Sequence, residues 1–470
     1  MNELQEKENS TFGIEDVVIG DRSSLPSKAV FFLLCLVPLF STVLFGGVDN
    51  VTWIFISIAW ALIVLLWIAE TWKAGGLLLD TSSIQLPLAG FILIGLVQLL
   101  PLGGSVAGLA GPASNALSLD PYSTRFFVVK LIVYLVYFGA CLTFINNEKR
   151  LQKAVYFVII FGTIMSLYGI LQRLASPDGI YGVRETSGAR PFGPFVNQHH
   201  FATFMQMTGG LALALLFGKK TRREVKMLLA AAVVVMGVAT VSTGSRGGLL
   251  GFLAMLIFVS LLNFLSGRWS GESRSKAGMQ RNFVIAAAGI ALVVVIFGVV
   301  LLIGGNDALL RGTGVMLADA DVTTGRLRFW PIALKIFLAH PILGAGFESF
   351  GVAFTQYDAS SGAFRVEQAH NEYLQTLADA GIAGFMCLLA FVGLLFKKGL
   401  KTIATSTGFR NEAAIGALAG CLGVLVHSFF DFPLRTPSNA FFFLMLCAIA
   451  TVSIASDDKP TRRRHRSTAP

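Results

Sequence analysis

Charged side chains are scarce in this chain of 470 residues: 14% are Asp, Glu, Lys or Arg, whereas 54% are hydrophobic. This composition, with a mean hydropathy of +0.69, excludes a soluble globular protein and predicts a polytopic membrane protein. The N-terminal region also lacks the basic segment and small-residue cleavage pattern of a secretory signal. We therefore expect the first apolar run to remain as a membrane span.

The sequence also has little that indicates a metal site. The five cysteines lie inside apolar stretches without metal-type spacing, so we expect them to act as small hydrophobic side chains. Asp319-Ala320-Asp321 is a D-x-D pattern that can hold a divalent cation, but matches of three residues are common by chance. We expect no metal and no cofactor, and the role of Asp319 and Asp321 is left open.

Twelve apolar stretches, each near the ~20 residues that cross a bilayer, predict an all-α fold with about 12 transmembrane helices. They are placed at about 29–47, 51–70, 83–102, 126–146, 153–172, 196–217, 226–242, 247–265, 283–304, 379–396, 413–430 and 437–456. The predicted organisation is an N-terminal cytoplasmic tail (1–28), nine spans (29–304), a long outer loop (305–378), three spans (379–456) and a basic cytoplasmic tail (457–470).

Lysine and arginine runs gather in the loops of one predicted side, as at Lys219 to Arg223 and Arg462 to Arg464. The positive-inside rule assigns that side to the cytoplasm, so the net charge of +10 reflects topology and nucleic-acid binding is not expected. In the long outer loop, residues 326–338 have the pattern of an amphipathic helix on the membrane surface. A second helix is expected from near Glu367 to a turn at Gly381.

The middle of the predicted spans is almost empty of ionisable side chains. Proton-coupled transporters keep such groups near the bilayer midplane, where each is expensive and retained for function. A polysaccharide transporter or flippase is therefore the alternative from a different class rather than the first hypothesis.

Arginines suited to chemistry fall on the outer side instead. Arg246 lies in the turn Ser242-Thr243-Gly244-Ser245-Arg246-Gly247-Gly248, whose backbone N–H groups can form an anion-binding nest. Arg326 follows Thr323-Thr324-Gly325 at an expected helix start, where anions are also favoured. Because guanidinium groups bind phosphate oxygens bidentately, two or three of them suit a diphosphate; lipid headgroups are the alternative ligand for each arginine alone.

Histidine supplies a candidate base. His370, in Gln368-Ala369-His370-Asn371-Glu372-Tyr373, lies at an expected junction of water and membrane, where neutral imidazole can accept a proton from a hydroxyl near pH 7. His427 and Asp431 are four residues apart, so we expect a structural pair on one helical face.

The other four histidines are expected to be structural or solvent-facing. His199 and His200 open a span and should be hydrogen-bonded at a capped helix start, His340 precedes a proline, and His465 is in the basic tail.

Five motifs, taken together in their order and spacing, resemble the bacterial O-antigen ligase and O-antigen polymerase superfamily over residues of about 170 to 450. They are Arg190-Pro191-Phe192-Gly193-Pro194-Phe195-Val196-Asn197, Ser245-Arg246-Gly247-Gly248, Gly325-Arg326 with Trp330, Ala369-His370-Asn371-Glu372-Tyr373-Leu374 and Asp431-Phe432-Pro433-Leu434-Arg435-Thr436-Pro437. The resemblance implies an inner-membrane glycosyltransferase that moves a glycan from undecaprenyl diphosphate to an acceptor on the periplasmic side.

The resemblance also implies roles for residues. Arg246 and Arg326, with Arg190, would hold the diphosphate, and His370 would activate the acceptor hydroxyl without a metal ion. Supporting positions would be Asn371, Glu372, His427, Asp431 and Arg435.

The acceptor is left open by the sequence. It is lipid A core for a ligase, a second lipid-linked glycan for an O-antigen or exopolysaccharide polymerase, or a Ser or Thr hydroxyl for a protein O-oligosaccharyltransferase. We rank the ligase first and expect contact with membrane lipids, while glycan structure and oligomeric state are not predicted.

Overall fold

The computed structural model describes residues 24–102, 115–175, 179–186, 190–219, 221–269, 291, 294–296, 326–359 and 365–454. Within these ranges the chain is all-helical, and its only extended pairings are two isolated bridges, Ile180 with Arg184 and Phe192 with Phe195. The predicted all-α class is therefore confirmed for the part of the chain that is described.

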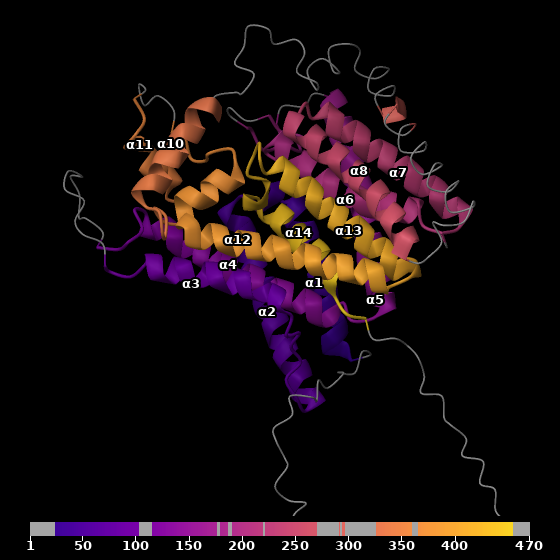
Figure 1. Cartoon of the computed structure of the whole chain (residues 1–470). Coiled ribbons are helices and arrows are strands. Elements are labelled where there is room, and N and C mark those ends of the chain that lie inside the picture. The colour runs from indigo at the N-terminus through magenta and orange to yellow at the C-terminus, as the bar shows by residue number, and fades with distance from the viewer. Residues whose placement is uncertain are drawn as a thin grey trace, which may run out of the picture.

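Figure 1 shows these helices packed as one bundle, with α2 projecting at its edge. The longer helices are α1 (Leu25–Val43), α2 (Asn50–Ala74), α3 (Leu86–Gln98), α4 (Pro121–Phe144), α5 (Glu148–Ala175), α6 (Gln198–Leu216), α7 (Arg223–Ser242), α8 (Arg246–Trp269), α10 (Arg326–Ala339), α12 (Glu372–Thr405), α13 (Gly408–His427) and α14 (Pro437–Thr451). The short elements are η1 (Phe45–Gly47), η2 (Ser83–Gln85), α11 (Phe350–Thr355) and η4 (Pro433–Arg435).

Eight of the described helices are long and apolar enough to cross a membrane: α1, α2, α4, α5, α7, α8, α12 and α13. These eight helices overlap eight of the predicted spans. Three further predicted spans overlap the shorter helices α3 and α14 and helix α6, which begins with polar residues. One predicted span therefore has no corresponding described helix. The exception, at about 283–304, lies almost entirely outside the described residues. A polytopic membrane protein is thus supported, while the number twelve, the sidedness and the domain boundaries stay predictions.

Helices α6, α8 and α13 pack backbone against backbone. A Cβ added to Gly210 of α6 would lie 2.7 Å from the carbonyl oxygen of Gly416 in α13, and one added to Gly251 of α8 would lie 2.6 Å from that of Gly423. Small residues permit such close approach between helices in membranes. As a result the starts of α6 and α8 and the end of α13 come together at one end of the bundle.

Helix α12 is interrupted at Gly381, whose φ of 62° and ψ of −161° are outside the helical region. The segment that follows α10 fits into this break: Ile382 N donates to Pro341 O at 2.8 Å, and Ala345 N donates to Ala378 O at 2.8 Å. The helix predicted from near Glu367 to a turn at Gly381 is confirmed at its C-terminal end, where Gly381 breaks the helix, and is wrong at its start. It begins at Glu372, because Asn371 caps it, and a further helical stretch follows the break.

The predicted amphipathic helix at 326–338 is confirmed as a helix, α10, which lies beside α11 at one end of α12 (Figure 1). One face of α10 is buried in a small apolar cluster through Ile332, Ala333 and Ile336, while Leu334 and Leu338 remain exposed. This cluster holds α10 against the segment that carries His370.

Candidate functional site

His370 and Asp431 form a hydrogen-bonded pair at the end of the bundle where α6, α8 and α13 converge. His370 Nδ1 lies 3.2 Å from Asp431 Oδ1, and their side chains are 33% and 1% exposed. A carboxylate that accepts from Nδ1–H leaves the opposite ring nitrogen, Nε2, as the proton acceptor. A partly exposed imidazole held by a buried carboxylate is suited to act as a general base.

The ring of His370 lies between two aromatic side chains. Phe329 of α10 stacks on it at a centroid distance of 6.1 Å, and Phe432 meets it edge to face at 5.0 Å. The His370 backbone has φ of 51°, a left-handed conformation that non-glycine residues seldom adopt. Such strain persists where surrounding contacts over-determine it, and it is concentrated at functional sites.

Those contacts come from the residues on either side of His370. Ala369 N donates to the Gln375 side chain at 2.6 Å. Asn371 caps α12 by accepting from the N–H groups of its first turn, and Glu372 N donates to Ser428 O at 2.9 Å just beyond α13. The predicted supporting role of Asn371 is thus consistent with its place in the fold: it fixes where α12 begins and therefore where His370 stands.

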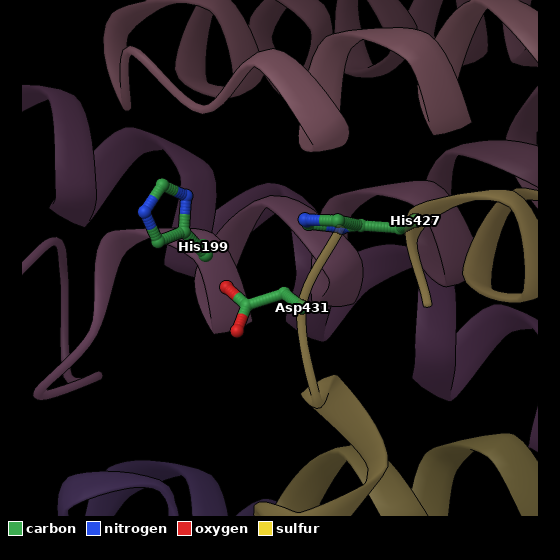
Figure 2. A group of neighbouring side chains, drawn as sticks. All are labelled: His199, His427 and Asp431. Carbon is green, nitrogen blue, oxygen red and sulfur yellow. The ribbon is translucent and has the colours of Figure 1, made fainter. Parts of the chain in front are cut away.

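Asp431 also faces two further histidines. One ligand atom each of His199, His427 and Asp431 lies within 4.8 Å of the others, and Figure 2 shows the carboxylate between the two rings. Burial raises the pKa of the Asp431 carboxyl, but the hydrogen bond from His370 and the charge of the nearby imidazoles outweigh burial and hold the pKa well below its usual range. Asp431 is therefore an anion at neutral pH.

His427 is a fixed, neutral imidazole. Its Nδ1 lies 2.7 Å from Thr203 Oγ1 and 3.3 Å from Gln206 Nε2, and an amide nitrogen only donates, so Nδ1 accepts and the ring proton is on Nε2. The expectation that His427 and Asp431 share one helical face is wrong, because α13 ends at His427. The chain instead turns after the helix and brings Asp431 back beside the ring.

His199 is linked to the start of α8. Its Nδ1 lies 2.7 Å from Ser245 Oγ, and the same hydroxyl accepts from Gly248 N at 3.0 Å, which caps the helix. Ser245 Oγ is also 3.5 Å from His427 Nε2. The spacing of these histidines and Asp431 would suit a metal ion, but the serine hydroxyl lies between the two rings and would have to be displaced or become a ligand.

The backbones of two of the three predicted diphosphate arginines lie beside this cluster. Arg246 follows Ser245 as the first residue of α8, and Arg190 O accepts from Gln198 N at 2.9 Å, directly before His199. Arg326 begins α10, but its side chain lies outside the described part of the structure, as do Asp319 and Asp321.

Arg435 has a different environment from a phosphate-binding arginine. Its guanidinium contacts Glu348 at 3.0 Å, Glu372 at 3.3 Å and Asp379 at 2.9 Å, with only 9% of the side chain exposed. Burial lowers the pKa of Arg435, but the carboxylates outweigh burial and raise it, so the guanidinium stays charged. Arg435 therefore joins η4, α12 and the segment before α11. It stabilises the part of the fold that carries His370.

Sequence reasoning missed His199 and Glu348 as parts of the site, and it included Ser245 only as a member of the Arg246 turn. The prediction that His199 belongs to a capped helix start is correct, because Asn197 accepts from His199 N at 2.8 Å, but it overlooked the ring. A usable signal was present: His199 opens its span on the same predicted side as Arg246 and His370.

The fold and this cluster define a polytopic helical membrane protein with an imidazole and carboxylate site at one end of its bundle. A family model described as O-antigen ligase matches residues 231–389, about a third of the chain, and confirms the resemblance to the O-antigen ligase and polymerase superfamily. This match supports a glycosyltransferase-like enzyme. Among curated proteins, none matches the chain.

The matched segment contains Arg246, Arg326 and His370. The partners that complete the site lie before or after it: His199 on one side, and His427, Asp431 and Arg435 on the other.

Proposed function

We propose that the protein transfers a glycan from undecaprenyl diphosphate to an acceptor hydroxyl on the periplasmic face of the bacterial inner membrane. The observation that carries this proposal is the pair of His370 and Asp431. It places a partly exposed proton acceptor inside the segment matched by the O-antigen ligase model. The acceptor hydroxyl loses its proton to His370 Nε2 as its oxygen attacks the anomeric carbon.

Arginine charge takes the place of a metal ion in this proposal. The bond from the anomeric carbon to the diphosphate oxygen breaks with its electron pair going to the diphosphate, and attack from the opposite face inverts the configuration. Arg246, Arg190 and Arg326 would bind the departing anion, since fixed guanidinium groups stabilise developing charge at a dehydrated site. Phe329 covers one face of His370, which would help to exclude water and limit hydrolysis.

The members of the superfamily differ in the acceptor molecule that receives the glycan. We propose ligation to lipid A core as the first assignment, with polymerisation onto a second lipid-linked glycan or transfer to a protein hydroxyl as the alternatives. All three use the same base and the same leaving group.

The direct test is to incubate the purified full-length protein in detergent with undecaprenyl-diphosphate glycan and each acceptor in turn. We expect a new glycoside with inverted anomeric configuration from one acceptor, at a rate that EDTA does not change. Detergent removes the second compartment that transport requires, so product formation would exclude a pure transporter. Unchanged donor with every acceptor would count against transfer, and loss of activity in EDTA that Mg²⁺ or Mn²⁺ restores would assign a role to Asp319 and Asp321.

The contribution of Asp431 can be measured with Asp431→Asn. The amide retains the size of the side chain but carries no charge to balance an imidazolium, so we expect kcat to fall about a hundredfold, the lower end of the range for general acid–base catalysis. The loss should be seen in kcat at saturating donor, because Asp431 is placed to act through His370. A raised KM with kcat preserved would assign Asp431 to donor binding alone and not to the base.

A further inference from the structure

His199 stands between the two halves of the proposed site. Through its cluster it approaches Asp431, the carboxylate that holds His370. Through Ser245 it contacts the residue before Arg246, and in the chain it follows Gln198, whose N–H donates to Arg190 O. His427 also approaches Asp431 and Ser245, but its contact with Ser245 is longer, at 3.5 Å against 2.7 Å for His199.

The two rings beside Asp431 differ in their freedom to change charge. His427 cannot take a second proton at Nδ1 without losing the hydrogen bond from the Gln206 amide, which can only donate. His199 Nδ1 faces the Ser245 hydroxyl, which can donate to a neutral ring. This hydroxyl accepts from Gly248 N and lies 3.5 Å from His427 Nε2, and it can accept from a protonated His199 by giving up that longer contact.

The orientation of the His199 ring suits contact with an anion. Its Nδ1 is directed at Ser245, and Figure 2 shows the other ring nitrogen, Nε2, pointing away from Asp431 and His427. The side chain is partly exposed, unlike that of His427. A protonated His199 would present Nε2–H outward while Asp431 balanced its charge from behind.

We propose that His199 is a further catalytic residue of this transfer: its imidazolium binds the donor diphosphate through Nε2–H and gives that proton to the leaving oxygen. This inference rests on the proposed function. As the anomeric C–O bond breaks, the electron pair goes to the diphosphate oxygen, the His199 proton joins it, and the acceptor proton moves to His370. Afterwards His370 releases its proton to water and His199 regains one.

Asp431 can balance the positive charge as it passes from His199 to His370. One carboxylate faces both imidazoles, so its negative charge balances His199 before transfer and His370 after it. The net charge of the cluster is the same at the start and the end of the step. The titratable groups near His199 are Asp431, His427 and His200, and the backbones of Arg246 and Arg190 adjoin its contacts at Ser245 and Gln198.

The test uses His199→Asn, whose side-chain amide occupies the position of Nδ1 and can keep the hydrogen bond to Ser245. His340→Gln is the matched control, since His340 lies after α10 and outside the cluster. Binding of inorganic diphosphate to the purified full-length protein is measured by calorimetry between about pH 6 and pH 8, where histidine changes charge. We expect about tenfold weaker binding in His199→Asn, the equivalent of one charge-assisted hydrogen bond, and a weaker dependence on pH than in wild type.

The second measurement is the rate of glycan transfer against pH. Wild type should lose rate at low and at high pH, and His199→Asn should lose the decline at high pH, with about a tenfold lower maximum because diphosphate is already a good leaving group. Equal diphosphate binding with the same pH dependence in wild type and His199→Asn would overturn the inference, whatever the transfer assay gives. Diphosphate binding that depends on His199 in a protein that transfers no glycan would instead reject the proposed function and keep the site.

Discussion

Replacing His370 by glutamine is expected to lower kcat for glycan transfer about a thousandfold, near the middle of the range for loss of a general base. Glutamine fills much of the space between Phe329 and Phe432 and can still donate to Asp431, so the hydrogen bond at 3.2 Å can be kept. It cannot take a proton from the acceptor hydroxyl. The measurement is single-turnover transfer in detergent with the donor at saturation.

Two control measurements on His370→Gln are diphosphate binding and thermal unfolding. His370→Gln should bind inorganic diphosphate as wild type does and unfold at a similar temperature, because the capping by Asn371 and the anchoring of Ala369 do not involve the ring. His340→Gln should transfer at the wild-type rate. Transfer by His370→Gln within tenfold of wild type would move the base elsewhere, and His199 would then be tested first.

The spans could be predicted from sequence because the bilayer imposes length and hydropathy on each segment separately. Helix ends were harder to predict. The break at Gly381 is predicted correctly, because glycine commonly ends a helix, but the start of α12 is expected too early. The hydrogen bonds that the segment from Pro341 to Ala345 supplies at the break could not be predicted, because a contact so distant in sequence has no local signal.

The site shows the same division between local and distant information. His370 was predicted because its motif and its place at a junction are properties of one segment. The link from His199 to Ser245 depends on how closely α6, α8 and α13 approach, and that is set by glycines facing one another across different helices. Arg435 was expected to support the site, but its contacts with Glu348, Glu372 and Asp379 could be identified only when three segments were seen together.

Arg246→Lys is expected to lower kcat/KM for the lipid-linked donor several hundredfold. Lysine keeps the charge at the first residue of α8, but it is a point charge and cannot reproduce the planar fork that binds two phosphate oxygens at once. Removal of one fixed donor from a site of developing negative charge costs a factor of this order. Arg326→Lys should behave similarly if its side chain reaches the same diphosphate.

The matched control is Arg222→Lys, an exposed arginine just before α7, at the end of the bundle opposite the His370 cluster. It should bind inorganic diphosphate and transfer glycan as wild type does. Because Ser245 caps α8 through Gly248 N, which lysine at position 246 leaves untouched, the helix start should be preserved and any loss should be a loss of phosphate binding. Full activity in Arg246→Lys would mean that charge alone suffices at this position, and bidentate binding of the diphosphate by Arg246 would be rejected.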